Sequence, residues 1–153
     1  AGVATGAVGG LVAIPPAAGF VGVMGALGIG FGAGILCYTA VLLRPRLGFD
    51  DALDVFAVHG IGGIWGALAT GIFAVAAIGG TSGLIESGNG DQMLTQVIAV
   101  LGTLAYSGIA TLIILKVLDV IPGLGLRVSA ADEDAGLDIS MHGERAFVSD
   151  GAD

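Results

Sequence analysis

Apolar runs long enough to cross a lipid bilayer constrain this sequence more than any other feature. The clearest of them covers about residues 93–120 and meets its first charged residue only at Lys116. A transmembrane helix needs about 20 consecutive, mostly apolar residues. Charged residues make up 12% of the chain, about half the share of a typical soluble domain. The sequence therefore predicts an all-α integral membrane protein, a polytopic bundle of transmembrane helices.

Four apolar runs organise the chain, at about residues 2–14, 21–43, 55–78 and 93–120. The first is too short to span a bilayer, so we expect only part of a helix there. Because the chain opens on Ala1, without Met or the basic start of a signal peptide, we expect it to be a piece of a longer protein. We predict transmembrane helices within residues 1–122 and a polar tail over residues 123–153.

Charge is distributed unevenly along the chain. The net charge of −8 comes mostly from acidic residues after residue 130, and its sign disfavours nucleic acid as a partner. The five cations are Arg44, Arg46, Lys116, Arg127 and Arg145. With one crossing per run, they share one side of the membrane, and the positive-inside rule makes that side cytoplasmic. We therefore expect a multi-pass protein of the cell membrane with a cytoplasmic C-terminal tail.

Glycines spaced four residues apart, such as Gly28 with Gly32 and Gly62 with Gly66, indicate helices that approach closely. So few helices would have little to pack against, and we expect further helices from elsewhere. The single cysteine, Cys37, excludes a disulfide framework and a cysteine metal cluster. We predict no metal site and no cofactor.

His59 is the ionisable group inside the third run. Asp51 is expected to cap that helix, with Asp54 in its first turn. An ionisable residue within a membrane span indicates a functional site, although a histidine that only hydrogen-bonds a neighbouring helix is an alternative. On a regular helix the positions beside the ring are glycines, namely Gly62, Gly63 and Gly66. Such spacing predicts a face almost free of side chains, directed at a packed helix or a cavity.

Three segments resemble the ammonium transporters of the Amt/Mep/Rh superfamily. The segment "DDALDVFAVHGIGGIWGALATGIFA" is similar to their tenth transmembrane helix, and "GLVAIPPAAGFVGVMGALGIG" to the end of the eighth and the start of the ninth. The segment "AGLDISMHGERAF" resembles the tail motif of the Amt branch. The resemblance implies the last part of an eleven-helix, inverted-repeat transporter that works as a homotrimer with one pore per subunit.

The resemblance also implies roles for residues of the third run. His59 matches the second of two histidines in a hydrophobic pore, where it would deprotonate or hydrogen-bond the passing ammonium. The partner histidine and the outer recruitment site would lie upstream of Ala1. Val55, Phe56 and Gly63 are candidates to line the pore, with core packing left open for Val55 and Phe56. The net transported species, whether ammonia, ammonium, or ammonia with a separately routed proton, is left open.

For the tail, the resemblance implies a regulatory segment that docks under the cytoplasmic face and touches the neighbouring subunit. Its candidate residues are Asp138, Ser140, His142, Gly143 and Glu144. Ser140 falls where plant relatives carry a phosphorylatable threonine, and the cytoplasmic face would bind a P-II signalling protein. The alternatives are an ammonium sensor that signals through its tail and an Rh-type gas channel. An enzyme is disfavoured, because the chain shows no nucleophile arrangement, metal set or phosphate loop.

Overall fold

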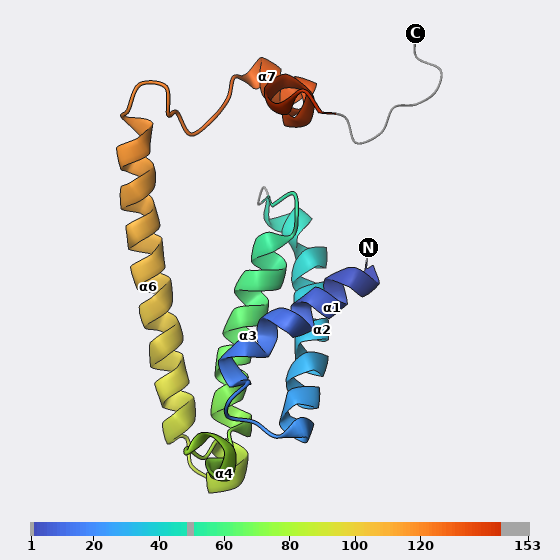
Figure 1. The fold of residues 1–153 in the computed structure, drawn as a ribbon, viewed down its shortest axis with the longest axis vertical. Helices are drawn as coiled ribbons and strands as arrows, with labels where there is room; N and C mark the ends of the chain where they lie inside the picture. Colours follow the sequence, from blue (N-terminus) through green and yellow to red (C-terminus); the bar gives the residue numbers. More distant parts are fainter. Residues whose placement is uncertain (1, 49–50, 145–153) are drawn as a thin grey trace. The chain divides into compact units, whose positions relative to one another are not determined.

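The computed structural model describes residues 2–48 and 51–144, and in these ranges the regular structure is entirely helical (Figure 1). This confirms the predicted all-α fold class. In chain order the elements are α1 (Gly2–Ala13), η1 (Pro15–Ala17), α2 (Val23–Leu47), η2 (Phe56–Gly60), α3 (Ile61–Phe73), α4 (Ala76–Gly79), α5 (Leu84–Ser87), α6 (Asp91–Asp119), α7 (Ala130–Ala135) and η3 (Asp138–His142). They divide into two units, and the boundary between Ala105 and Tyr106 lies within α6.

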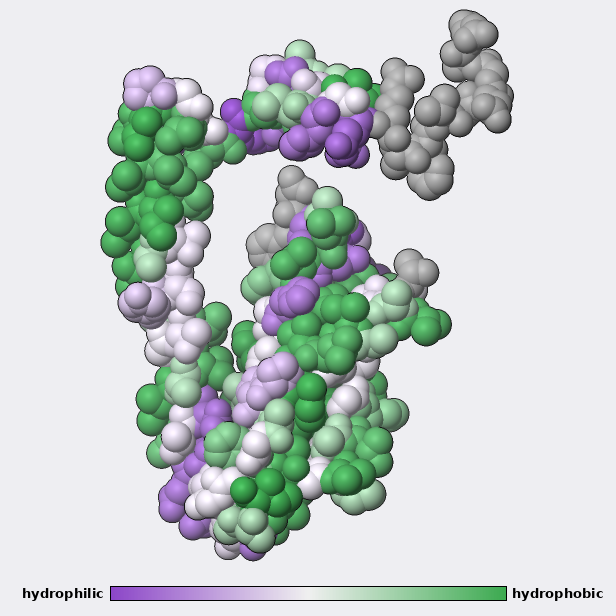
Figure 2. Space-filling view, viewed as in Figure 1, coloured by the Kyte–Doolittle hydropathy of each residue, from purple (hydrophilic) through white to green (hydrophobic). Residues whose placement is uncertain are grey.

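Three helical segments are long and apolar enough to cross a membrane, namely Val23–Leu47, Phe56–Phe73 and Asp91–Asp119. A shorter apolar segment, Gly2–Ala17, comes before them. Large hydrophobic side chains such as Met24, Phe31 and Leu101 are exposed along these helices, and Figure 2 shows hydrophobic colours over much of their surface. Apolar faces of this extent require lipid or further helices as neighbours.

The second span continues beyond the expected end at residue 43 and passes through Pro45 to Leu47. Proline lacks an N–H and interrupts helices in their interior, but so close to the end it removes a single hydrogen bond. The helix then ends at Gly48, whose φ of 69° is the left-handed conformation that glycine adopts freely.

The third span ends at Phe73, earlier than the expected residue 78. Ala74 turns to an extended conformation with ψ of 141°. The N–H of Val75 then donates to the carbonyl of Phe20, and that of Gly83 to the carbonyl of Ala74, both at 2.8 Å. These distant partners replace helical hydrogen bonds, so tertiary pairing ends the helix.

Small residues form the core of the first unit, where α1 crosses α2 and α3 (Figure 1). The fully buried cluster contains Ala13, Ala17, Ile29, Ala33 and Ala69. Trp65 packs against this cluster, and its indole N–H donates to the carbonyl of Ile29 at 2.9 Å. A Cβ added at Gly32 would overlap the Trp65 ring, so α2 accepts the indole only because a glycine lies there. The sequence prediction of closely packed helices holds for this unit.

Candidate functional site

His59 lies in a single π-helical turn, η2, immediately before α3. The N–H of Ile61 donates both to the carbonyl of Phe56, five residues earlier, and to that of Val58. Single π turns within α-helices are rare, and many of them occur at functional sites. The wide turn interrupts the 3.6-residue period, so helical spacing counted from His59 does not carry into α3.

Asp51 caps this span, as the sequence predicts. Its Oδ1 accepts the N–H of Val55 and its Oδ2 accepts the N–H of Phe56, both at 2.8 Å. A carboxylate at this position satisfies backbone donors that have no helical partner and lies at the positive end of the helix dipole. Asp54 does not lie in a helical turn as expected, because its φ of 56° is left-handed. Asp and Asn adopt this conformation more readily than other non-glycine residues.

Arg44 connects the end of α2 to the start of this span. Its Nη1 donates to the carbonyl of Asp51 and lies 2.9 Å from Oδ1 of Asp54. The second contact is an ion pair without hydrogen-bond geometry, since that oxygen is buried and accepts no hydrogen bond. Sequence reasoning took Arg44 only as a topology signal. The available sequence signal for this contact was the pairing of Arg44, near the end of α2, with the acidic residues Asp51 and Asp54 a few positions later.

A hollow of about 720 Å³ opens beside the π turn. Its lining is mostly apolar and comprises Ala40, Leu43, Arg44, Leu47, Asp51, Val55, Phe56, Ala57, His59, Gly60 and Ile61. The structure therefore brings three of the predicted pore residues, Val55, Phe56 and His59, to one hollow. All three are exposed in the described chain, so Val55 and Phe56 do not belong to its buried core.

Gly63 lines a different and smaller hollow of about 280 Å³. The other residues of this lining are Gly60, Ile64 and Ala67 of the third span and Ala99, Val100, Thr103 and Leu104 of α6. A Cβ added at Gly63 would meet no atom within 4 Å. Gly60 lines both hollows, so they adjoin at that residue.

Gly62 and Gly66 are buried on another face of the span. A Cβ at Gly62 would lie 3.2 Å from Sγ of Cys37, and one at Gly66 would overlap the carbonyl of Ala13. The expected bare face is therefore divided, because two of its glycines pack against α1 and α2 and Gly63 faces open space. Cys37 is buried in this packing and donates weakly to the carbonyl of Val58 at 3.6 Å.

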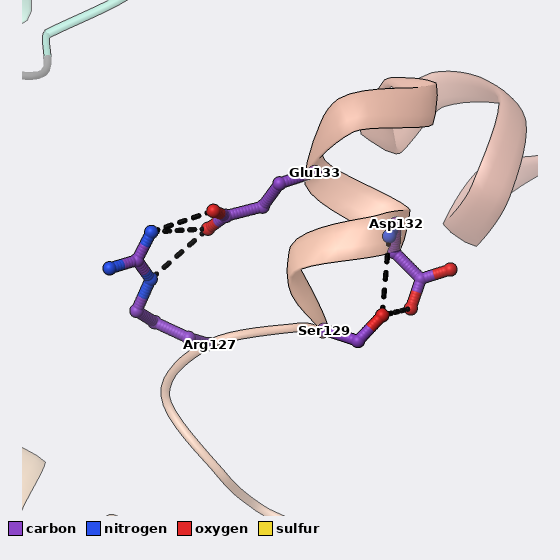
Figure 3. Close-up of polar contacts among 4 residues, drawn as sticks. All are labelled: Arg127, Ser129, Asp132 and Glu133. Atoms are coloured by element: carbon purple, nitrogen blue, oxygen red, sulfur yellow. Dashed lines mark hydrogen bonds and ion pairs between the residues drawn. The ribbon is translucent and has the colours of Figure 1, made fainter.

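The tail candidates lie in the second unit, Tyr106–Asp153, in which α7 and η3 follow the end of α6. Ser129 caps α7 by accepting the N–H of Asp132, and Arg127 pairs with both carboxylate oxygens of Glu133 (Figure 3). When both oxygens of a carboxylate bind an arginine, the pair fixes the orientation of the guanidinium group as well as its distance. These contacts order the start of the tail.

Four of the five tail candidates follow in η3 and at its end. The hydroxyl of Ser140 is directed at two carbonyls, those of Asp132 at 3.1 Å and Gly136 at 3.0 Å. The N–H of Glu144 donates to the carbonyl of Asp138 at 2.8 Å, across Gly143 with its φ of 67°. His142 ends η3 and is exposed, as are the other candidates. Within residues 2–48 and 51–144 no group of three or more His, Cys, Asp or Glu residues is placed to hold a metal ion.

Comparison with known proteins provides an independent view of this arrangement. The model of a family described as the Ammonium Transporter Family matches residues 1–147. Ammonium transporter Amt1 of Archaeoglobus fulgidus is 48% identical over 147 residues, which cover 96% of this chain and 37% of the relative. An ammonium transporter of Aquifex aeolicus is 50% identical over 147 residues, covering 95% of this chain and 34% of the relative.

A solved structure is also similar. The crystal structure of Saccharomyces cerevisiae Mep2 matches with a TM-score of 0.72 at 37% identity, over 83% of this chain and 30% of that one. The chain thus spans about a third of the length of these relatives.

Proposed function

The chain belongs to the Ammonium Transporter Family, and we propose that it is the closing part of a protein that carries ammonium or ammonia across a membrane. In this proposal His59 lines the path in its middle and hydrogen-bonds or deprotonates the substrate. The relatives it matches are named as transporters and not as enzymes, which agrees with a role in transport.

The observation that carries this proposal is the position of His59. Its exposed imidazole lines a mostly apolar hollow, and it is the only ionisable side chain within the span Phe56–Phe73. An ammonium ion loses its hydration on entering such a lining, which is costly, whereas neutral ammonia loses far less. An imidazole titrates near neutral pH and can accept the proton or a hydrogen bond at this point.

Val55 and Phe56 would form the apolar wall next to His59, since the same hollow contains all three. Gly63 would contribute through the adjoining hollow, where an added side chain has room to project. We propose that Gly63→Leu reduces transport by filling this space.

For the complete protein we propose a homotrimer in the plasma membrane, with transmembrane helices within residues 1–122 and a cytoplasmic tail over residues 123–153. The tail would regulate transport through Asp138, Ser140, His142, Gly143 and Glu144, and a P-II signalling protein would dock on the same side. The ordered contacts around Ser140 support a regulatory role for this residue. A phosphate there removes the hydroxyl proton that the two carbonyls share and adds about two negative charges beside Asp138.

Replacement of the histidine tests the proposal. In the full-length protein, His59→Ala should leave assembly nearly unchanged, because the ring is exposed in this unit, and transport or its selectivity over potassium should fall sharply. Purified protein in liposomes, assayed for ammonium and potassium currents, measures both. A parent-like rate and selectivity in His59→Ala would refute a pore role for His59. If the protein is instead an ammonium sensor, the parent protein will bind ammonium and signal through its tail but carry no current.

A further inference from the structure

We propose that Arg44 is a positioning residue for His59, which holds the π turn in place and thereby directs the imidazole into its hollow. This inference rests on the transport function proposed above. It concerns a residue on a different helix from the histidine, at the far side of a short connection.

The contacts form an unbroken series from the guanidinium to the π turn. Nη1 of Arg44 binds the carbonyl of Asp51 and the carboxylate of Asp54, the latter at 2.9 Å. The carboxylate of Asp51 in turn accepts the N–H groups of Val55 and Phe56, both at 2.8 Å. The carbonyl of Asp54 accepts the N–H of Val58 at 2.9 Å. Three of the N–H groups that begin the span are therefore held by residues that Arg44 contacts.

Two parts of this segment have uncommon backbone conformations that need stabilising contacts from their surroundings. Asp54 is left-handed, with a φ of 56°, and Phe56–Gly60 is a π turn. Both are uncommon, and such conformations persist where surrounding contacts determine them. The contacts of Arg44 and Asp51 supply that support at the N-terminal end of the turn.

Loss of the support has a defined geometric consequence. A π turn contains one residue more than an α turn, so its relaxation to α-helix moves the register by one residue. At 3.6 residues per turn, that is a rotation of about 100° around the helix axis. Both α3 and η2 pack on α1 and α2, but α3 is the longer segment and buries more residues there, so the rotation falls on η2, which contains His59. The imidazole would then leave the hollow that it now lines.

Four substitutions in the full-length transporter test this role. Arg44→Met removes the charge and keeps a long side chain, and Asp54→Asn removes the other charge of the pair while tolerating the left-handed conformation. Arg44→Lys is the conservative variant, because one nitrogen makes both contacts in the structure and the single lysine nitrogen can replace it. Arg46→Met is the matched control, since Arg46 is exposed two residues further along the same helix.

The measurements are trimer assembly of the purified protein and the ratio of ammonium to potassium current in liposomes. We expect Arg44→Met and Asp54→Asn to assemble and to lower this ratio by about tenfold or more, since a displacement of about 1 Å in a functional group can cost about a hundredfold. Arg44→Lys should retain most of the parent ratio, and Arg46→Met all of it. In a His59→Ala background, Arg44→Met should cause no further change, because both act through one group.

Several outcomes overturn the inference. Parent-like selectivity in both Arg44→Met and Asp54→Asn does so, as does an additional loss from Arg44→Met once His59 is absent. Equal losses of the current ratio in Arg44→Lys and Arg44→Met would show that a positive charge at residue 44 is not what positions His59. If Arg44→Met fails to assemble, the result for Asp54→Asn decides. If His59→Ala leaves the ammonium current and its ratio to the potassium current unchanged, the proposed function itself is refuted. If His59→Ala changes them strongly while the Arg44 and Asp54 variants do not, only the positioning role is refuted.

Discussion

Gly66 and Gly63 allow a sharp test of the packing, because they lie three residues apart on the same helix and differ in their surroundings. Gly66 is buried, and a Cβ added there would lie 2.8 Å from the carbonyl carbon of Ala13 and closer still to its oxygen. A Cβ added at Gly63 meets nothing within 4 Å. Alanine at either position increases helix propensity by about 0.5–1 kcal/mol relative to glycine.

The propensity gain is common to both variants, so the difference between them isolates the packing cost. The atoms that crowd Gly66 belong to the backbone of Ala13 and cannot rotate away, so α1 has to shift. Overpacking of this kind costs about 1–3 kcal/mol. We therefore expect Gly66→Ala to lower the free energy of unfolding, Gly63→Ala to leave it equal or slightly higher, and the two to differ by about 1–3 kcal/mol.

Equilibrium unfolding of the purified full-length protein in mixed micelles, titrated with a denaturing detergent, measures this difference. Equal shifts in the two variants would refute the reasoning, since they would mean that α1 does not approach α3 at Gly66. A larger loss for Gly63→Ala would place the close helix contact on the opposite face.

Two further predictions concern the ends of the spans. In a protein whose Cys37 has been replaced, a cysteine introduced at Ser87 should react with an impermeant thiol reagent added outside intact cells, and a cysteine introduced at Ala131 should not. The reverse labelling would contradict the proposed topology. The N–H of Ala76 donates to Glu86 at 2.7 Å and holds the pKa of that carboxyl below its ordinary value. A lowered pKa means that the contact stabilises the loop above the ordinary glutamate value and is lost as pH falls through the lowered one. The protection factor of the Ala76 amide, which is the exchange rate corrected for its intrinsic dependence on pH, should therefore fall on acidification, and an unchanged protection factor in Glu86→Gln would contradict this.

Periodicity and composition were sufficient to predict the helical architecture, because each long span contains an apolar run of bilayer length and little charge. The cap at Asp51 was also predictable, since an acidic residue just before an apolar run has one common structural use. The small-residue packing followed from glycine spacing, although spacing alone did not say which glycine packs. Gly62 and Gly66 contact α1 and α2, and Gly63 does not.

The end of α3 was not predictable from local sequence. The residues after Phe73 are as apolar as those before it, and the helix ends because Phe20 offers a carbonyl to Val75. That partner lies far away in the chain, so no pattern within the span reports it. Tertiary hydrogen bonds override propensity in such places.

Helical periodicity could not predict the π turn, and this turn changes which residues lie on the same face as His59. Sequence spacing joined His59 to three glycines on one face, on the assumption of a regular helix from Asp54 onward. The structure instead begins the span with a left-handed aspartate and a wide turn, and charged residues outside the apolar run contact both. In the proposed site, the direction of the imidazole is therefore set by groups outside the apolar run. In this chain those groups are Arg44, Asp51 and Asp54, and their effect on His59 is the property that mutation of the histidine alone would not detect.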